Sequence, residues 1–309
     1  MSENKKDNDN FKSGIVTIIG RPNVGKSTLL NRILNTKVAI VSQVPQTTRN
    51  QIRGIYNDAR GQIVFIDTPG IHFGRDNLDK LMNESSRMTI DDADCIIYLA
   101  DVSRRTGEEE KAVVERLKNV KGHIIMGLNK VDLGASRIPE YISLWENTKG
   151  CSVNELKNFT LLPLAGERGT NVDKLIDIIF DLLPMGPALY PPDMVTDLPQ
   201  RIAIAEIIRE KLFMLMREEV PHSIGVVVEA MQAKKNIIHI KALIYVEREA
   251  HKEIVIGKGG QVLKTVGTQA REELERLLQS KIFLELTVKT KESWRDDLSI
   301  LAELGYTHS

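Results

Sequence analysis

The feature that most constrains the fold is the loop pattern G-x-x-x-x-G-K-[ST] at residues 20–27. It follows an apolar run at residues 15–19 and precedes a helical pattern at residues 26–34, which fits a strand–loop–helix turn. Glycines in such a loop let backbone N–H groups point at phosphate oxygens, and the helix adds its positive N-terminal end. Lys26 would neutralise the β- and γ-phosphates of a nucleotide, and the Ser27 hydroxyl would ligate Mg²⁺. The residues predicted to hold the nucleotide here are Gly20, Arg21, Pro22, Asn23, Val24, Gly25, Lys26, Ser27 and Thr28.

Short β-rich runs alternate with amphipathic helical stretches on both sides of this loop. Strands are predicted at residues 15–19, 52–56, 63–66, 95–100, 123–128 and 159–163. Helices are predicted between most of them, notably at residues 26–34, 108–118 and 172–182. Strands that alternate with helices indicate βαβ units, so we expect an α/β P-loop domain whose mostly parallel sheet has helices on both faces.

The alternation stops in a segment rich in proline. Residues 183–193 contain four prolines and a glycine, which cannot continue a helix or a central strand. Beyond it the elements follow in the order α-β-β-α-α-β, which predicts a small α+β domain of a different kind. Its elements are expected at residues 201–218, 223–231, 236–247, 261–279 and 281–289, with a short helix near residues 296–303. The predicted organisation is a disordered tail at 1–12, the α/β domain at 13–184, a linker at 185–200 and the second domain at 201–309.

Composition narrows the setting in which the chain works. Its 42 Lys+Arg balance 42 Asp+Glu, so nucleic-acid binding must rest on a local site rather than on overall charge. Two cysteines make neither a disulfide framework nor a zinc site, which fits a reducing compartment. The polar N-terminus has no apolar core, and no apolar stretch approaches the roughly 18 residues that span a bilayer. We therefore expect a cytoplasmic protein.

A second motif, Asp67-Thr68-Pro69-Gly70, follows the apolar run at residues 63–66. A carboxylate at the end of a strand beside the phosphate loop can hold the Mg²⁺ shell through water. The Gly70 N–H can then meet the γ-phosphate and sense its loss. In isolation the same four residues are as well explained as an ordinary turn.

A third motif, Asn129-Lys130-Val131-Asp132, indicates which base is bound. A carboxylate at Asp132 can accept two hydrogen bonds, from guanine N1–H and from the 2-amino group. Adenine lacks that amino group and would leave a buried acceptor unpaired, at about 1–3 kcal/mol. Asn129 would help on the far edge of the base, and the Lys130 stem would pack on the ring. Alone these residues could start a helix, but third in this order they favour GTP over ATP.

The order of these motifs resembles that of the translation-factor-like GTPases. The segment Gln46-Thr47-Thr48-Arg49 is similar to the effector loop of the Era family of ribosome-assembly GTPases. The resemblance implies that Thr48 joins Ser27 and Asp67 as a Mg²⁺ ligand when GTP is bound, and that Lys26, Thr48 and Gly70 are the catalytic residues. β-propensity alone would also explain two threonines before a strand. The remaining nucleotide contacts that the motifs imply are Asp67, Thr68, Pro69, Gly70, Ile71, Asn129, Lys130, Val131, Asp132, Ala165 and Gly166.

Two positions depart from common GTPase patterns. The fifth motif usually reads Ser-Ala, whereas here Ala165-Gly166 stands in its place, so a hydroxyl is lost and weaker nucleotide binding is expected. Ile71 stands where Ras-like enzymes have a water-orienting glutamine, a substitution that the Era family shares, so hydrolysis should be slow unless assisted. Asn23 resembles an asparagine that helps bind K⁺ in related GTPases. It would equally suit a turn as a residue that tolerates positive φ.

The second domain contains the pattern G-x-x-G at residues 257–260, between two predicted helices and near Lys252, Lys258 and Lys264. With 21 glycines in the chain, chance also supplies such a pattern, so from the residues alone RNA binding and a plain tight turn are equally good interpretations. The order of elements resembles that of the type II KH domain that ends members of the Era family. Short sequence segments are similar too, at residues 206–211, 246–249 and 255–259. That resemblance covers about residues 13–306. It implies RNA contacts at Gly257, Lys258, Gly259, Gly260 and Lys264.

The family resemblance implies a GTP-hydrolysing switch that binds 16S ribosomal RNA near its 3′ end and assists assembly of the 30S subunit. GTP or GDP and Mg²⁺ would be its cofactors, and K⁺ a further candidate. It also implies a chain that is monomeric when free and that allows weak peripheral association with the inner membrane. Two alternatives stay open: a GTPase whose second domain binds protein or membrane, and a constitutive RNA-binding module that uses GTP only for stability. A duplicated GTPase is excluded because the second half has no phosphate-loop pattern.

Overall fold

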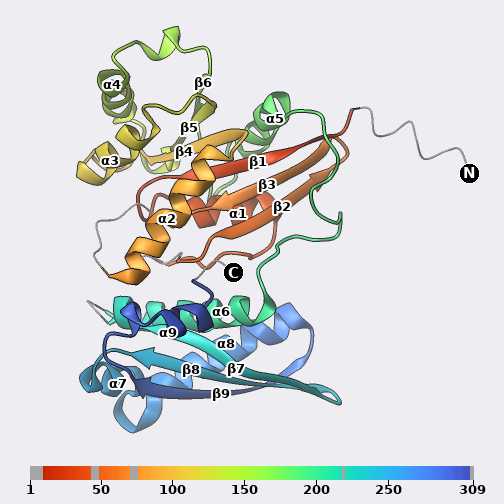
Figure 1. Cartoon of the computed structure of the whole chain (residues 1–309), viewed down its shortest axis with the longest axis vertical. Coiled ribbons are helices and arrows are strands. Elements are labelled where there is room, and N and C mark those ends of the chain that lie inside the picture. The colour runs from red at the N-terminus through yellow and green to blue at the C-terminus, as the bar shows by residue number, and fades with distance from the viewer. Residues whose placement is uncertain (1–9, 43–48, 70–75, 218–219, 307–309) are drawn as a thin grey trace, which may run out of the picture. The chain divides into compact units, whose positions relative to one another are not determined.

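The computed structural model in Figure 1 describes residues 10–42, 49–69, 76–217 and 220–306. The chain forms two compact units; the main boundary lies between Asp197 and Leu198, and residues 40–42 and 76–81 group with the second unit. Thr47, Thr48, Gly70 and Ile71, for which the sequence predicts roles, lie outside the described residues. No helix in the part of the chain that is described has both the length and the apolar composition needed to cross a membrane.

The first unit is built on a six-stranded sheet in the order β2-β3-β1-β4-β5-β6. β2 runs antiparallel to β3, and the other neighbours are parallel. The strands are β1 (Lys12–Ile19), β2 (Ile52–Asp58), β3 (Gly61–Asp67), β4 (Cys95–Asp101), β5 (His123–Asn129) and β6 (Phe159–Pro163). The expected α/β class with a mostly parallel sheet is confirmed, and each predicted strand lies within a strand of the structure.

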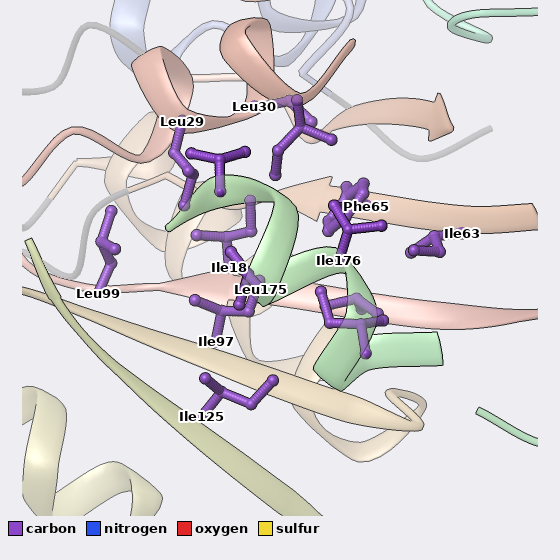
Figure 2. Close-up of a cluster of buried hydrophobic side chains, with 14 of the residues drawn as sticks. Ile18, Leu29, Leu30, Ile63, Phe65, Ile97, Leu99, Ile125, Leu175 and Ile176 are labelled. Atoms are coloured by element: carbon purple, nitrogen blue, oxygen red, sulfur yellow. The ribbon is translucent and has the colours of Figure 1, made fainter. Parts of the chain in front are cut away.

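Helices cover both faces of this sheet (Figure 1). They are α1 (Lys26–Leu34), α2 (Asn77–Asp91), α3 (Glu108–Leu117), α4 (Ile138–Lys149) and α5 (Val172–Leu182). Because side chains alternate along a strand, β4 sends Ile97 to one core and Tyr98 to the other. Figure 2 shows the first core, where Leu29 and Leu30 of α1 and Leu175 and Ile176 of α5 pack over strand residues. The second core contains residues of α3 and α4, where Trp145 stacks on Tyr98 with ring centroids 5.7 Å apart.

The second unit has a three-stranded sheet in the order β7-β8-β9, antiparallel between β7 and β8 and parallel between β8 and β9. Its strands are β7 (Gly225–Lys234), β8 (Ile237–Val246) and β9 (Lys281–Thr290). Its helices are α6 (Gln200–Leu215), α7 (Glu249–Ile256), α8 (Gln261–Leu278) and α9 (Leu298–Glu303). One face of the sheet packs on α6 and α8, and the predicted α-β-β-α-α-β order is present. α6 ends three residues before the predicted limit of 218, because Met216 already has an extended backbone.

The proline-rich segment predicted as a linker packs along the first unit. Gln62 is fully buried in β3, and its side-chain oxygen accepts hydrogen bonds from the Leu189 and Tyr190 N–H groups at 2.7 and 2.8 Å. The Ile55 N–H of β2 donates to the Val195 carbonyl at 2.8 Å. Residues 185–197 therefore belong to the first unit, whose boundary lies at Asp197 rather than at 184. We call residues 185–197 the strap.

Candidate nucleotide-binding and RNA-binding sites

The phosphate loop turns sharply between β1 and α1. Gly25 has φ 101°, in the left-handed region that favours glycine, and a Cβ there would lie 2.7 Å from Asn129 Nδ2. Asn23 also has a positive φ of 62° and is a residue type that tolerates this conformation. The loop thus brings backbone groups close together at the start of α1, as an anion-binding turn requires.

Lys26 is folded back over this loop. Its ammonium donates to the carbonyl of Gly20 at 3.2 Å and to that of Arg21 at 3.3 Å. Burial lowers the pKa of Lys26 below its usual value, and the carboxylates of Asp67 and Glu110 partly oppose the change. A bound phosphate would favour the charged ammonium, so the loop is arranged to gain from an anionic ligand.

Two of the three predicted Mg²⁺ ligands lie in contact. The Ser27 hydroxyl donates to Asp67 Oδ2 at 2.6 Å, at the carboxyl end of β3, and Asp67 is fully buried. Thr68 follows and anchors this strand end by donating its hydroxyl to the Ile18 carbonyl at 3.0 Å. A hydroxyl and a carboxylate are hard oxygen ligands of the type that Mg²⁺ prefers, so the donor set fits that ion. Thr48, the third predicted ligand, lies outside the described residues.

The predicted guanine motif begins at Asn129, the last residue of β5, and contacts the phosphate loop. Asn129 Nδ2 donates to the Val24 carbonyl at 2.7 Å, and its Oδ1 accepts from Gly166 N–H at 2.9 Å. Both ends of this amide are therefore engaged by the protein, so Asn129 joins the phosphate loop to the fifth motif instead of serving only the base edge. Lys130 Nζ lies 2.7 Å from Asp101 Oδ2 and 2.9 Å from the Asn23 carbonyl.

Asp132 lies in the turn Val131–Leu133, whose Val131 N–H donates to the carbonyl of Leu164, the residue before the fifth motif, at 3.1 Å. Its Oδ2 is 3.0 Å from Arg168 Nε, and the Arg168 side chain is 69% exposed. A mostly exposed partner can move aside, which leaves the carboxylate able to accept from a guanine edge. Sequence reasoning missed both Arg168 and Asp101. Asp101 could have been found, because it is the last residue of the apolar strand β4, at the same sheet edge.

Arg21, a predicted nucleotide contact of the phosphate loop, directs its side chain toward α3. Its guanidinium contacts Glu110 of α3, with Nε 2.9 Å from Oε2. The backbone of Arg21 still takes part in the loop through the bond from Lys26. The nucleotide contact of Arg21 stays a prediction, and in this structure the buried Glu110 carboxylate holds its guanidinium.

The G-x-x-G loop of the second unit lies between α7 and α8. Gly257, Gly259 and Gly260 all have positive φ, at 73°, 61° and 76°. Among the described residues, a Cβ built on Gly259 or Gly260 would meet no atom within 4 Å, so a ligand backbone can approach there. Lys258 and Lys264 are exposed, whereas Lys252 is paired with Glu249 at 3.0 Å. The predicted RNA contacts are thus brought together at the start of α8.

Comparisons with known proteins agree with this division of the chain. A family model described as a 50S ribosome-binding GTPase matches residues 15–130, and a KH domain model matches residues 219–295. GTPase Era of Halothermothrix orenii is 44% identical over 297 residues, which cover 96% of this chain and 99% of that protein. GTPase Era of Geobacter sp. (strain M21) is 44% identical over 308 residues, covering 99% and 100% of the two chains.

Two solved structures have the same fold over 96% of this chain and 100% of their own, each at 38% identity. One is a variant of Aquifex aeolicus Era bound to GDP·AlF4⁻, with a TM-score of 0.87. The other is Era in complex with MgGDPNP and nucleotides 1506–1542 of 16S ribosomal RNA, with a TM-score of 0.88. The fold and the two sites define a P-loop GTPase that carries a KH domain. The chain belongs to the Era family of GTPases, and its nucleotide and metal cofactors are GTP or GDP and Mg²⁺.

Proposed function

We propose that this GTPase is a switch that binds small-subunit ribosomal RNA through the G-x-x-G loop of its KH domain and assists assembly of the 30S subunit. The observation that carries the proposal is the loop itself, with three positive-φ glycines and an exposed lysine at position 258. Such a loop admits a nucleic-acid backbone, and the lysine supplies a phosphate contact. A relative that binds nucleotides 1506–1542 of 16S ribosomal RNA together with MgGDPNP supports the choice of RNA.

The nucleotide state controls RNA affinity in this proposal. GTP, but not GDP, offers a γ-phosphate that Thr48 and Gly70 can contact, and this contact would select the RNA-binding state. RNA should therefore bind more tightly with a non-hydrolysable GTP analogue than with GDP. Equal affinity in the two states would favour the constitutive RNA-binding module instead.

Replacing Lys258 by alanine tests the RNA site. We expect the affinity for an oligonucleotide of the 16S 3′ end to fall roughly tenfold, since a charged hydrogen bond contributes about 1.5 kcal/mol. The salt dependence of binding should also become shallower by about one charge. Lys234→Ala is the matched control, because Lys234 is also an exposed lysine of this unit but lies at the far end of β7. Unchanged RNA affinity in Lys258→Ala would favour a second domain that binds protein or membrane.

We further propose that K⁺ assists hydrolysis near Asn23. Because Ile71 cannot orient water by hydrogen bonding, charge neutralisation must supply more of the catalysis. Hydrolysis should be about tenfold faster in potassium than in sodium at equal ionic strength, since the cation replaces charge that an arginine finger supplies elsewhere. Asn23→Gly removes the side chain yet tolerates the φ of 62°, so it should abolish the difference without straining the loop. Equal rates of the unmutated protein in the two salts would instead point to a partner on the ribosome.

The cytoplasmic location, the monomeric state and the weak membrane association stay predictions of the sequence.

A further inference from the structure

A buried ion pair links the phosphate loop to α3. Glu110 lies in the first turn of this helix and is 0% exposed, and the Arg21 side chain that it contacts is 11% exposed. The Tyr98 hydroxyl of β4 donates to the other carboxylate oxygen, Oε1, at 2.6 Å. Oε1 therefore accepts a hydrogen bond from the sheet, whereas Oε2 forms the ion pair with the loop and accepts no hydrogen bond from the described residues.

The guanidinium of Arg21 extends the link to the guanine motif. Its Nη2 donates to the Tyr141 hydroxyl of α4 at 3.1 Å, and that hydroxyl donates to the Asp101 carbonyl at 2.6 Å. The Asp101 carboxylate in turn binds Lys130. A single arginine of the phosphate loop is thus held between α3, α4 and the strand end that supports Lys130.

The surroundings of Glu110 make a packing role a poor explanation for the carboxylate. The buried residues of α3 are Glu110, Val113, Val114 and Leu117, so the charge lies on an otherwise apolar face. Taking a carboxylate out of water is unfavourable, and replacing a buried ion pair by apolar side chains often leaves stability unchanged or raises it. Burial indeed raises the pKa of Glu110 above its usual value, while Tyr98 and Arg21 counteract this. A leucine would fill the position at a lower energetic cost, so the carboxylate is explained better by its ion pair with Arg21 than by packing.

Through its ion pair, Glu110 fixes Arg21, whose backbone carbonyl accepts a hydrogen bond from Lys26. Arg21 carries, on its own carbonyl, one of the two acceptors for Lys26 Nζ. The neighbouring Gly20 carbonyl is the other acceptor. If the Arg21 side chain were released, the loop between Gly20 and Gly25 would gain freedom that nucleotide binding must remove again.

We propose that Glu110 is a positioning residue for nucleotide binding, which acts through Arg21 to fix the phosphate loop before GTP or GDP arrives. The β-phosphate is common to both nucleotides, so the effect is on their shared binding and not on the γ-phosphate alone. Loss of the pair should raise the dissociation constants of GDP and of a non-hydrolysable GTP analogue by the same factor. It should change kcat much less, because uniform binding is what is removed. The inference concerns the GTPase reaction and is independent of RNA binding.

A double-mutant cycle with Glu110→Gln and Arg21→Gln tests the proposal in the full-length chain. We expect each single substitution to weaken both nucleotides by about tenfold, and the double variant to be no weaker than either, because the residues act as one unit. Glu108→Gln is the matched control, since Glu108 is an exposed carboxylate of the same helix turn and should leave both dissociation constants unchanged. Thermal unfolding of each variant separates loss of affinity from loss of folded protein.

The possible results lead to different conclusions. Unchanged nucleotide affinity in folded Glu110→Gln would overturn the proposal, as would two effects that multiply in the double variant. Effects on the GTP analogue alone would also overturn it and would place Arg21 at the γ-phosphate. If Glu110→Gln does not fold, Arg21→Lys serves as the second variant, because lysine keeps the charge but cannot bridge Glu110 and Tyr141 together. Nucleotide affinity equal to that of the unmutated chain in Arg21→Lys would then count against the positioning role.

Discussion

Replacing Asp132 by asparagine should weaken GTP binding by roughly tenfold or more and shift the preference of the protein to xanthine nucleotides. The carboxylate in the turn Val131–Leu133 is the acceptor that matches the N1–H and 2-amino donors of guanine. An asparagine presents an N–H₂ group there, which opposes the 2-amino group of guanine but can donate to the 2-oxygen of xanthine. A mismatched buried pair costs about 1–3 kcal/mol, which is the basis of the expected factor. Competition between GDP and XDP measures the change in preference directly.

Arg168→Ala is the matched control for this experiment. It removes the ion pair with Asp132 at 3.0 Å and keeps the carboxylate, so selectivity for guanine should be retained. If Asp132→Asn itself kept full selectivity for guanine, the base would have to be recognised by another part of the protein.

Lys26→Ala should weaken nucleotide binding by about a hundredfold and abolish detectable hydrolysis. The lysine is buried at the start of α1, and removing its contacts to phosphate forfeits more than one charge-assisted hydrogen bond, each of about 1.5–3 kcal/mol. Lys118→Ala provides the control, because Lys118 lies in an exposed pair with Glu115 that contributes little. Fluorescent GDP titration gives the affinity, and phosphate release gives the rate.

The same variant also tests the division of the chain. Because each unit has its own hydrophobic core, thermal unfolding of the second unit should be unaffected by Lys26→Ala. Two separate transitions in circular dichroism, with the second unchanged, are the expected result. If both units lost their structure together, the boundary between Asp197 and Leu198 would not separate independent cores.

Local patterns predicted most of the secondary structure and failed where contacts are distant in sequence. The strands of the first unit are recognisable because their apolar runs are buried on both faces, as in β4. The prolines of the strap excluded a helix and a central strand. The strap is held by Gln62, whose side chain accepts hydrogen bonds from two strap N–H groups that lie 127 and 128 residues away in sequence. No local pattern encodes such a contact.

The nucleotide site shows the same contrast. Motif order was enough to expect Ser27 and Asp67 together. The parallel strands β1, which leads through the loop to Ser27, and β3, which ends at Asp67, finish at the same sheet edge. The periodicity of α3 favours an apolar residue at position 110. The glutamate that stands there instead was the one local sign that this position has a role beyond packing. Its meaning depends on Arg21, which lies on a different element and becomes a neighbour only in the folded chain.

The strap covers an edge of the first unit's sheet that could otherwise pair with another chain. β2 is the last strand on its side of the sheet, and an uncovered edge strand offers N–H and C=O groups that can pair with another chain. The strap occupies that edge through the Ile55–Val195 hydrogen bond and the bridge between Gly54 and Thr196. Because Pro191 and Pro192 lack N–H donors, the strap cannot continue as a regular strand that would itself expose a new edge. A GTPase fragment cut at residue 184 would have an open edge prone to aggregation, whereas one cut after Asp197 would keep its own protective cover.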